Sequence, residues 1–217
     1  MSMSALQHAA KPKPEVIRRH SRVTRVTHWL NALCVIFLLM SGLNIFMAHP
    51  SLYWGQYGAD FDKPAFSIGA TGTPQHPRGQ TTIGDWRIDT TGLLGASWNH
   101  GALTAQTFPS WMTLPSWRDL ESGRRWHFFF AWVFAINGLI YLIVSILTRH
   151  VQRDLAPTKE QIRPSHILHD IAQHARLRFP TGEAAKHYNV LQKLAYLAVI
   201  AVLAPLMVLT GLTMSPG

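Results

Sequence analysis

Three long apolar stretches that contain no charged side chain constrain this chain more than any other feature. They cover residues 28–47, 126–148 and 194–214. Each has about the 20 residues that a helix needs to cross a hydrocarbon core of roughly 30 Å. Charged residues make up only 14% of the chain, and they lie between these stretches. The pattern predicts an all-α membrane protein, a transmembrane helix bundle with three spans in this chain.

The basic residues are distributed unevenly between the segments that flank these spans. Residues 1–27 carry six Lys and Arg, residues 149–193 carry eight, and the longer segment 48–123 carries four. Basic residues are enriched on the cytoplasmic side of a membrane. The distribution therefore predicts a cytoplasmic N-terminus, an outer loop at 48–123 and an inner loop at 149–193. The net charge of +9 is therefore expected to reflect contact with the membrane surface rather than binding of nucleic acid.

The segments outside the spans have distinct compositions. Residues 1–17 are polar with two Lys-Pro pairs, which predicts a disordered cytoplasmic tail. Residues 165–174 have the pattern of an amphipathic helix on the membrane surface. Pro205 lies inside the third span and is expected to kink it.

The outer loop, residues 48–123, is rich in Gly and Pro, which indicates short turns and irregular structure. It also contains five tryptophans. They are Trp54, Trp86, Trp98, Trp111 and Trp117. Two interpretations remain open: an aromatic belt at the membrane interface, formed by Trp111, Trp117 and Trp126, or a compact platform that docks a partner.

Two histidines stand at the beginnings of spans. His28 opens the first and His127 opens the second. Ionisable groups within spans tend to face the protein interior, and neutral imidazole is an axial ligand of haem iron. A histidine hydrogen-bonded at the headgroup level is the other interpretation. The chain has one cysteine, Cys34, and no C-x-x-C-H sequence, so a covalently attached c-type haem is excluded.

The positions of these histidines imply separate sites. His28 lies at the inner end of its span and His127 at the outer end of its span, about 20 residues or roughly 30 Å of helix apart. They cannot bind the same iron, so two ligands imply two haems, one near each face. Within the chain, candidates for second ligands are His150 and His187 near the inner face and His49 near the outer face.

Several segments resemble the bacterial cytochrome b561 and nickel-iron hydrogenase b-type cytochrome family, which includes the cytochrome subunits of formate dehydrogenases. The similarity covers residues 18–48 and 123–215. The segments that carry it are RVTRVTHWLN at 22–31 with SGL at 41–43, GRRWHFFFAW at 123–132, KHYNVLQKLA at 186–195 and LTGLT at 209–213.

The resemblance implies a membrane domain at 18–217, with a periplasmic loop at 48–123 and a cytoplasmic loop at 149–193. It implies that His28 is a ligand of an inner haem b and His127 a ligand of an outer haem b. A fourth helix supplies the other ligands in that family, so this chain is expected to lack a C-terminal fourth helix. Asn189 matches a quinone contact of the family, although Leu191 stands where some members have glycine.

The resemblance implies a di-haem cytochrome in the bacterial inner membrane. Such a protein would transfer electrons between a periplasmic oxidoreductase subunit, for example one of the molybdopterin type, and quinone in a respiratory chain. The chain would then be an electron-transfer subunit of an oxidoreductase complex rather than an enzyme by itself. The alternative is a haem-free membrane anchor for such an oxidoreductase.

Overall fold

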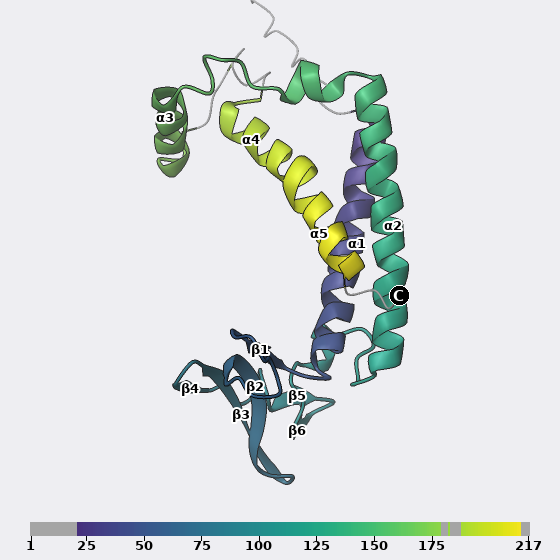
Figure 1. Cartoon of the computed structure of the whole chain (residues 1–217), viewed down its shortest axis with the longest axis vertical. Helices are drawn as coiled ribbons and strands as arrows, with labels where there is room; N and C mark the ends of the chain where they lie inside the picture. The colour runs from purple at the N-terminus through teal and green to yellow at the C-terminus, as the bar shows by residue number, and fades with distance from the viewer. Residues whose placement is uncertain (1–20, 179–181, 183–187, 214–217) are drawn as a thin grey trace, which may run out of the picture.

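The computed structural model describes residues 21–178, 182 and 188–213. Helices α1, Arg22–Phe46, and α2, Leu120–Leu147, lie side by side and run in opposite directions, with a β-rich segment at one end of the pair (Figure 1). A third helical stretch, Val190–Thr213, begins away from this pair and approaches it at its C-terminal end. All three are long and apolar enough to cross a membrane. The predicted tail at 1–17 lies outside the described residues.

Both long helices begin at a side-chain cap before the predicted spans. The Ser21 hydroxyl accepts a hydrogen bond from the Thr24 backbone N–H at 3.0 Å. The Asp119 carboxylate accepts one from the Ser122 N–H at 3.0 Å. Such caps satisfy backbone donors that have no partner within the helix. Both helices therefore begin about one and a half turns before the apolar stretches, and these first turns contain basic and polar residues.

The third helical stretch is interrupted in its middle. It consists of α4, Val190–Ala198, a π-helical turn η4, Val199–Leu203, and α5, Ala204–Thr213. The turn lies directly before Pro205, where the sequence predicts a kink. Proline has no N–H and its ring crowds the preceding turn, so a wider turn relieves the clash.

The outer segment contains β-structure, so the prediction of an all-α fold describes only the membrane part. The antiparallel sheet has the order β1-β2-β3-β4, and β5 and β6 form a separate hairpin. The strand bounds are β1 Ser51–Tyr53, β2 Pro64–Thr73, β3 His76–Ile83, β4 Trp86–Asp89, β5 Ser97–Asn99 and β6 Ala102–Thr104. A short 3-10 helix η1, Ser110–Met112, follows the hairpin. The expectation of irregular structure here is wrong, because β2 and β3 pair over eight residues.

A small core joins this β-rich segment, hereafter the outer domain, to the end of α1. Met47, Ile68 and Phe108 are buried there together. The side chain of Asn44, which is 1% exposed, donates 2.7 Å hydrogen bonds to the carbonyl oxygens of Pro115 and Trp117. The outer domain is therefore packed against the helix pair rather than tethered to it.

At the end of the helix pair opposite the outer domain, the chain turns sharply after α2. Arg149 has a φ of 52°, and the π-helical turn η2, Val151–Leu155, follows at an angle to α2. Helix α3, Pro164–Ala175, covers the predicted amphipathic segment 165–174. Its neighbour in the structure is α4.

The membrane helices expose large apolar side chains and bury small or polar ones. Leu147 is 78% exposed and Leu39 63%, whereas Cys34 and Ser41 are fully buried. A soluble protein would bury the large apolar residues instead. This inverted distribution suits a hydrocarbon solvent, in which helices associate through small and polar residues.

Candidate functional site

Polar and aromatic contacts fix the register between α1 and α2. Near the inner end, the Asn137 amide donates to the Thr27 carbonyl at 2.8 Å and to Asn31 Oδ1 at 2.7 Å. Further out, the rings of Phe37 and Phe130 stack at 4.2 Å with an interplanar angle of 3°. These contacts set which residues of α1 and α2 lie at the same depth.

His127 lies against α1 at the level of Ser41. Its Nδ1 atom is 3.1 Å from Ser41 Oγ, and the Ser41 hydroxyl donates to the Phe37 carbonyl at 2.6 Å. Because the hydroxyl proton is used in that bond, its oxygen accepts, and Nδ1 of His127 carries the proton. This assigns the neutral tautomer whose Nε2 lone pair is available to a metal.

Gly42 provides the surface on which the His127 ring rests. A Cβ atom at position 42 would lie 3.6 Å from Cε1 of His127, in van der Waals contact. The ring is half-buried and held by a hydroxyl on one side, as ligating histidines are when their second nitrogen is hydrogen-bonded. His127 is therefore a candidate ligand whose Nδ1 atom is held by a hydrogen bond.

His28 has a different environment. It is an exposed residue on the N-terminal half of α1, and its ring packs edge-on against Trp29 with a centroid distance of 5.7 Å. This placement leaves the imidazole on the surface of the helix pair. The surface is where a third element or a cofactor can approach it.

The two histidines are closer in depth than the sequence predicts. His127 is level with Ser41, which is 41 − 28 = 13 residues along α1 from His28. At 1.5 Å per residue this is about 20 Å rather than 30 Å. The difference arises because His127 lies two turns into α2, after the capped start at Leu120. One iron still cannot bridge them.

Two of the proposed second ligands have hydrogen-bond partners of their own. His49 Nε2 bonds the Tyr53 hydroxyl at 2.9 Å in the outer domain, and His150 Nδ1 bonds the Asp154 carboxylate at 2.7 Å. His187 lies outside the described residues. In the described ranges no group of three or more His, Cys, Asp or Glu side chains is arranged to hold a metal ion.

Asn189 serves as the N-cap of α4. Its side-chain oxygen accepts from the Gln192 N–H at 2.8 Å, and its amide nitrogen lies 3.3 Å from His174 Nε2. These contacts give Asn189 a structural role at the inner end of the third helix. Its contact with quinone remains a prediction.

Two residues next to His127 were not predicted as part of the site. Ser41 and Gly42 lie in a segment that resembles the cytochrome family, but their partner is 86 residues away in the chain. A small hydroxyl residue followed by glycine inside an apolar span was the available signal. This Ser-Gly pair does not by itself identify His127 as its partner, because the register of α1 against α2 is not known from the sequence.

Comparisons with known proteins agree on one family. The sequence profile described as prokaryotic cytochrome b561 matches residues 19–217. A protein of Azospira oryzae, provisionally named as the protein-methionine-sulfoxide reductase subunit YedZ1, is 28% identical over 200 residues. That alignment covers 92% of this chain and 71% of the relative. No solved structure matches the chain significantly.

Proposed function

Because the chain belongs to the prokaryotic cytochrome b561 family, we propose that it transfers electrons between a periplasmic oxidoreductase subunit and the quinone pool. It is an integral membrane protein of the b-type cytochrome class. The proposed location is the bacterial inner membrane, with a cytoplasmic N-terminus. The proposed cofactors are two haem b groups, one near each face.

The geometry of His127 is the observation that carries this proposal. Ser41 holds Nδ1 of the imidazole at 3.1 Å and thereby directs Nε2 away from α1. A haem-free anchor has no need for a hydroxyl that fixes the tautomer of a half-buried histidine. The arrangement therefore supports a metal-binding role for His127 and favours a cytochrome over an anchor.

Haem b supplies one-electron exchange at the iron, and the protein supplies imidazole ligands, a low dielectric and hydrogen bonds to the ligands. In the proposal His127 serves the outer site and His28 the inner site. Their separation of about 20 Å along α1 supports two sites, one towards each membrane surface. No side chain of this chain has to act as acid or base on the partner's substrate.

The outer domain is the proposed docking surface for the oxidoreductase. Large aromatic side chains are exposed there, including Trp54 at 92%, Phe61 at 84% and Trp86 at 77%. Exposed aromatic residues are enriched in protein–protein contacts. The relative's name describes it as a subunit of a reductase, which supports a partner of the oxidoreductase class.

The inner end of the bundle is the proposed place of quinone exchange, beside His28 and the start of α4 at Asn189. The basic loop at 149–193 lies at this end, and its charge supports a cytoplasmic location.

The test is an absorption spectrum of the purified protein with its partner subunits, in oxidised and reduced form. A reducible Soret and alpha band is expected. His127→Ala and His28→Ala should each remove about half of the haem. The matched control is His49→Ala, which removes an imidazole bonded to Tyr53 in the outer domain. Absence of haem in the wild-type complex would favour the anchor function, and full haem content in both variants would overturn the ligand assignment.

A further inference from the structure

The four-stranded sheet of the outer domain has one apolar and one polar face. Directly paired residues of neighbouring strands carry their side chains on the same face, so they form rows across the sheet. One row, hereafter the apolar row, contains a residue from each of β1, β2, β3 and β4, namely Leu52, Phe66, Ile83 and Trp86. The adjacent row points to the opposite face, because successive side chains alternate along a strand. It is entirely polar and consists of Ser51, Ser67, Thr82 and Arg87.

The end of α1 covers part of the apolar face. Ile68 lies two residues beyond Phe66 on the same face of β2, and it is buried together with Met47. Phe66 packs against this core, as do Leu43 and Phe46 from the last turns of α1. The apolar row is therefore in contact with the end of a helix that is long and apolar enough to cross a membrane.

The rest of the apolar row is uncovered. Leu52 is 55% exposed, Ile83 51% and Trp86 77%. Within the described strands β1 to β4, this face carries no charged side chain. The row crosses four strands and is roughly 14 Å long at a strand spacing of about 4.8 Å. A continuous apolar surface of this kind marks a contact with a protein or with a membrane.

The position of the apolar row identifies the membrane as its partner. The tip of the β2–β3 hairpin points away from the helices, so the row lies at the end of the sheet nearer to them (Figure 1). A surface that continues sideways from the last turns of a membrane helix meets lipid. An ion pair between Lys63 and Asp85 lies at the same end of the sheet. Charge at this end suits the headgroup region rather than the hydrocarbon, and tryptophan is enriched in that region.

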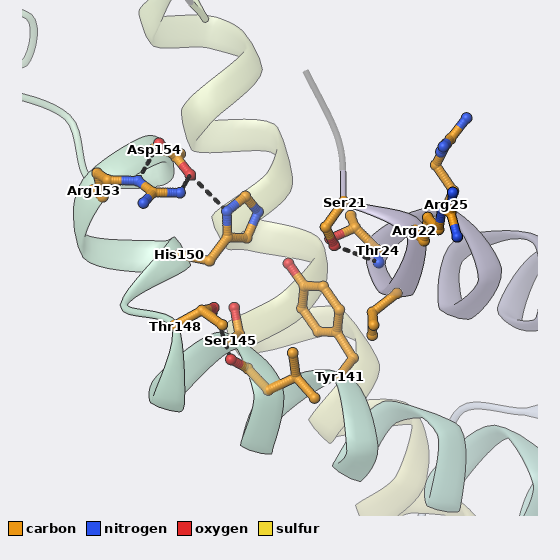
Figure 2. A pocket seen from close by; sticks show the side chains of 12 residues that line it. Ser21, Arg22, Thr24, Arg25, Tyr141, Ser145, Thr148, His150, Arg153 and Asp154 are labelled. Carbon is orange, nitrogen blue, oxygen red and sulfur yellow. Dashed lines mark hydrogen bonds and ion pairs between the residues drawn. The ribbon is translucent and has the colours of Figure 1, made fainter. Parts of the chain in front are cut away.

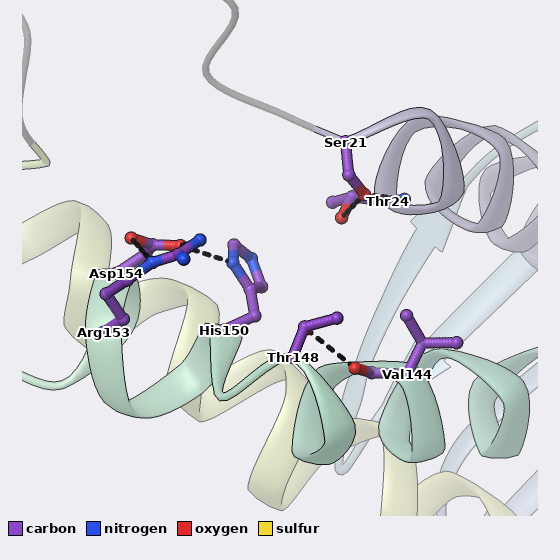
Figure 3. Close-up of polar contacts among 7 residues, drawn as sticks. All are labelled: Ser21, Thr24, Val144, Thr148, His150, Arg153 and Asp154. Carbon is purple, nitrogen blue, oxygen red and sulfur yellow. Dashed lines mark hydrogen bonds and ion pairs between the residues drawn. The ribbon is translucent and has the colours of Figure 1, made fainter.

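The opposite end of the helix pair has a different character. The polar side chains around a cavity of about 470 Å³ bond to groups of the chain itself. Arg153 and His150 both bond the Asp154 carboxylate (Figure 2). The Thr148 hydroxyl donates to the Val144 carbonyl at 2.7 Å (Figure 3). These groups are satisfied within the chain, whereas the apolar row at the outer end is not covered by any described residue.

We propose that the apolar row lies in the headgroup region of the membrane leaflet at the outer end of α1. Ile83 and Trp86 enter this region beside the helix, and the polar row faces water. The lipid contact fixes the tilt of the outer domain at a second point besides Asn44. It needs neither haem nor the oxidoreductase, and it leaves Trp54 and Phe61, which lie outside the strands, for docking of the partner.

The test is fluorescence quenching in the complete protein, reconstituted into phosphatidylcholine nanodiscs. Ile83→Cys on the Cys34→Ser background carries a small environment-sensitive fluorophore. A phosphatidylcholine with a nitroxide near the top of its acyl chain should quench this label, and aqueous iodide should lose most of its effect. Arg87→Cys is the matched control, because it lies next to Trp86 in β4 but on the polar face. Iodide should quench the label at position 87, and the nitroxide lipid should not.

Two outcomes at position 83 would overturn the proposal. Quenching by iodide as strong as at position 87 would show that the apolar row faces water. Shielding from both quenchers, whether in the protein alone or only after the oxidoreductase is added, would assign the row to a protein partner. The haem spectrum should be the same in both labelled proteins, so this result is independent of the cytochrome function.

A second variant tests the row without a label. The chain has eight tryptophans, and brominated phosphatidylcholine quenches those that reach lipid. Trp86→Phe should lower the emission that this lipid quenches, because one lipid-exposed indole is removed. Trp98→Phe, in the separate β5–β6 hairpin, is the matched control and should leave that part of the emission unchanged. If Trp86→Phe also leaves it unchanged, the apolar row does not contact the membrane.

Discussion

At the residue scale, the α1–α2 interface is made of side chains that are small or amide-bearing. Thr27, Cys34 and Ser41 are buried at intervals of seven residues on α1, and Asn137 faces them from α2. In a lipid solvent, apolar burial gives little driving force between helices. Close packing and hydrogen bonds have to supply the specificity. One of these interface residues, Ser41, also contacts His127.

The Ser41–His127 contact gives the prediction at this scale. In Ser41→Ala the imidazole loses the hydroxyl that contacts Nδ1, so its orientation is less firmly fixed. Affinity for the outer haem is expected to fall by about 10–100-fold, the usual effect of removing such a partner. The measurement is haem titration of the apoprotein complex. The control is Thr210→Ala, whose hydroxyl bonds only the carbonyl of Leu206 and of Met207 in its own helix. Equal losses in both variants would contradict a role specific to His127.

At the element scale, the outer domain depends on close crossings of the backbone. Gly79 in β3 lies under the loop that precedes β5, and a Cβ atom there would be 2.0 Å from the Leu94 carbonyl oxygen. Gly95 makes a similar approach to Gly69, with a φ of 77°. In the sequence these glycines indicate turns. In the structure they allow two layers of backbone to pack closely.

Gly79→Ala is expected to destabilise the outer domain by about 1–3 kcal/mol, because overpacking against a backbone atom cannot be relieved by a rotamer change. Thermal unfolding followed by tryptophan fluorescence measures this. Gly69→Ala is the matched control, since nothing lies within 4 Å of a Cβ atom at that position. If the two alanine variants melt alike, the close crossing does not contribute to stability.

The cap of α2 makes an acid-dependent contribution to stability. The Ser122 backbone N–H, and then its hydroxyl, hold the pKa of the Asp119 carboxyl below its ordinary value. A carboxyl with a lowered folded pKa contributes stability above its unfolded pKa of about 3.9, and that stability is lost as the pH falls through the folded pKa. Thermal unfolding of the wild type should therefore shift downward below about pH 4.

Asp119→Asn isolates this effect, because asparagine also caps helices but does not titrate. Its melting temperature should be close to that of the wild type at pH 7 and should fall less between about pH 5 and pH 3. Parallel curves for the two proteins over that range would rule out the cap as a source of the acid sensitivity.

At the scale of the whole molecule, the sequence predicts the membrane part better than the outer part. Charge-free runs of about 20 residues identify helices because length and polarity alone decide whether a segment can cross lipid. The strands at 64–73 and 76–83 have no comparable signal, since Gly69, Gly72 and Gly79 break their alternation. His28 and His127 are evident from position, whereas Ser41 becomes visible only through a contact that spans 86 residues.

The orientation of the chain is a further prediction at this scale. Cys34 is fully buried and is the only cysteine, so single cysteines can be introduced at exposed positions on the Cys34→Ser background. Gln75→Cys, at the β2–β3 turn, should react with a membrane-impermeant thiol reagent in intact spheroplasts. Lys159→Cys, in the inner loop, should react only after the membrane is opened. The reverse pattern would place the N-terminus outside.

The Asn44 joint has a mechanical consequence. Asn44 holds the carbonyls of Pro115 and Trp117, and Asp119 N–H reaches its side-chain oxygen at 3.3 Å. It lies less than one turn along α1 from Ser41. Asn44 therefore attaches the outer domain to α1 within a few ångströms of the Ser41 hydroxyl that contacts His127. The same turn of α1 therefore carries both the attachment of the outer domain, through Asn44, and the contact with His127, through Ser41.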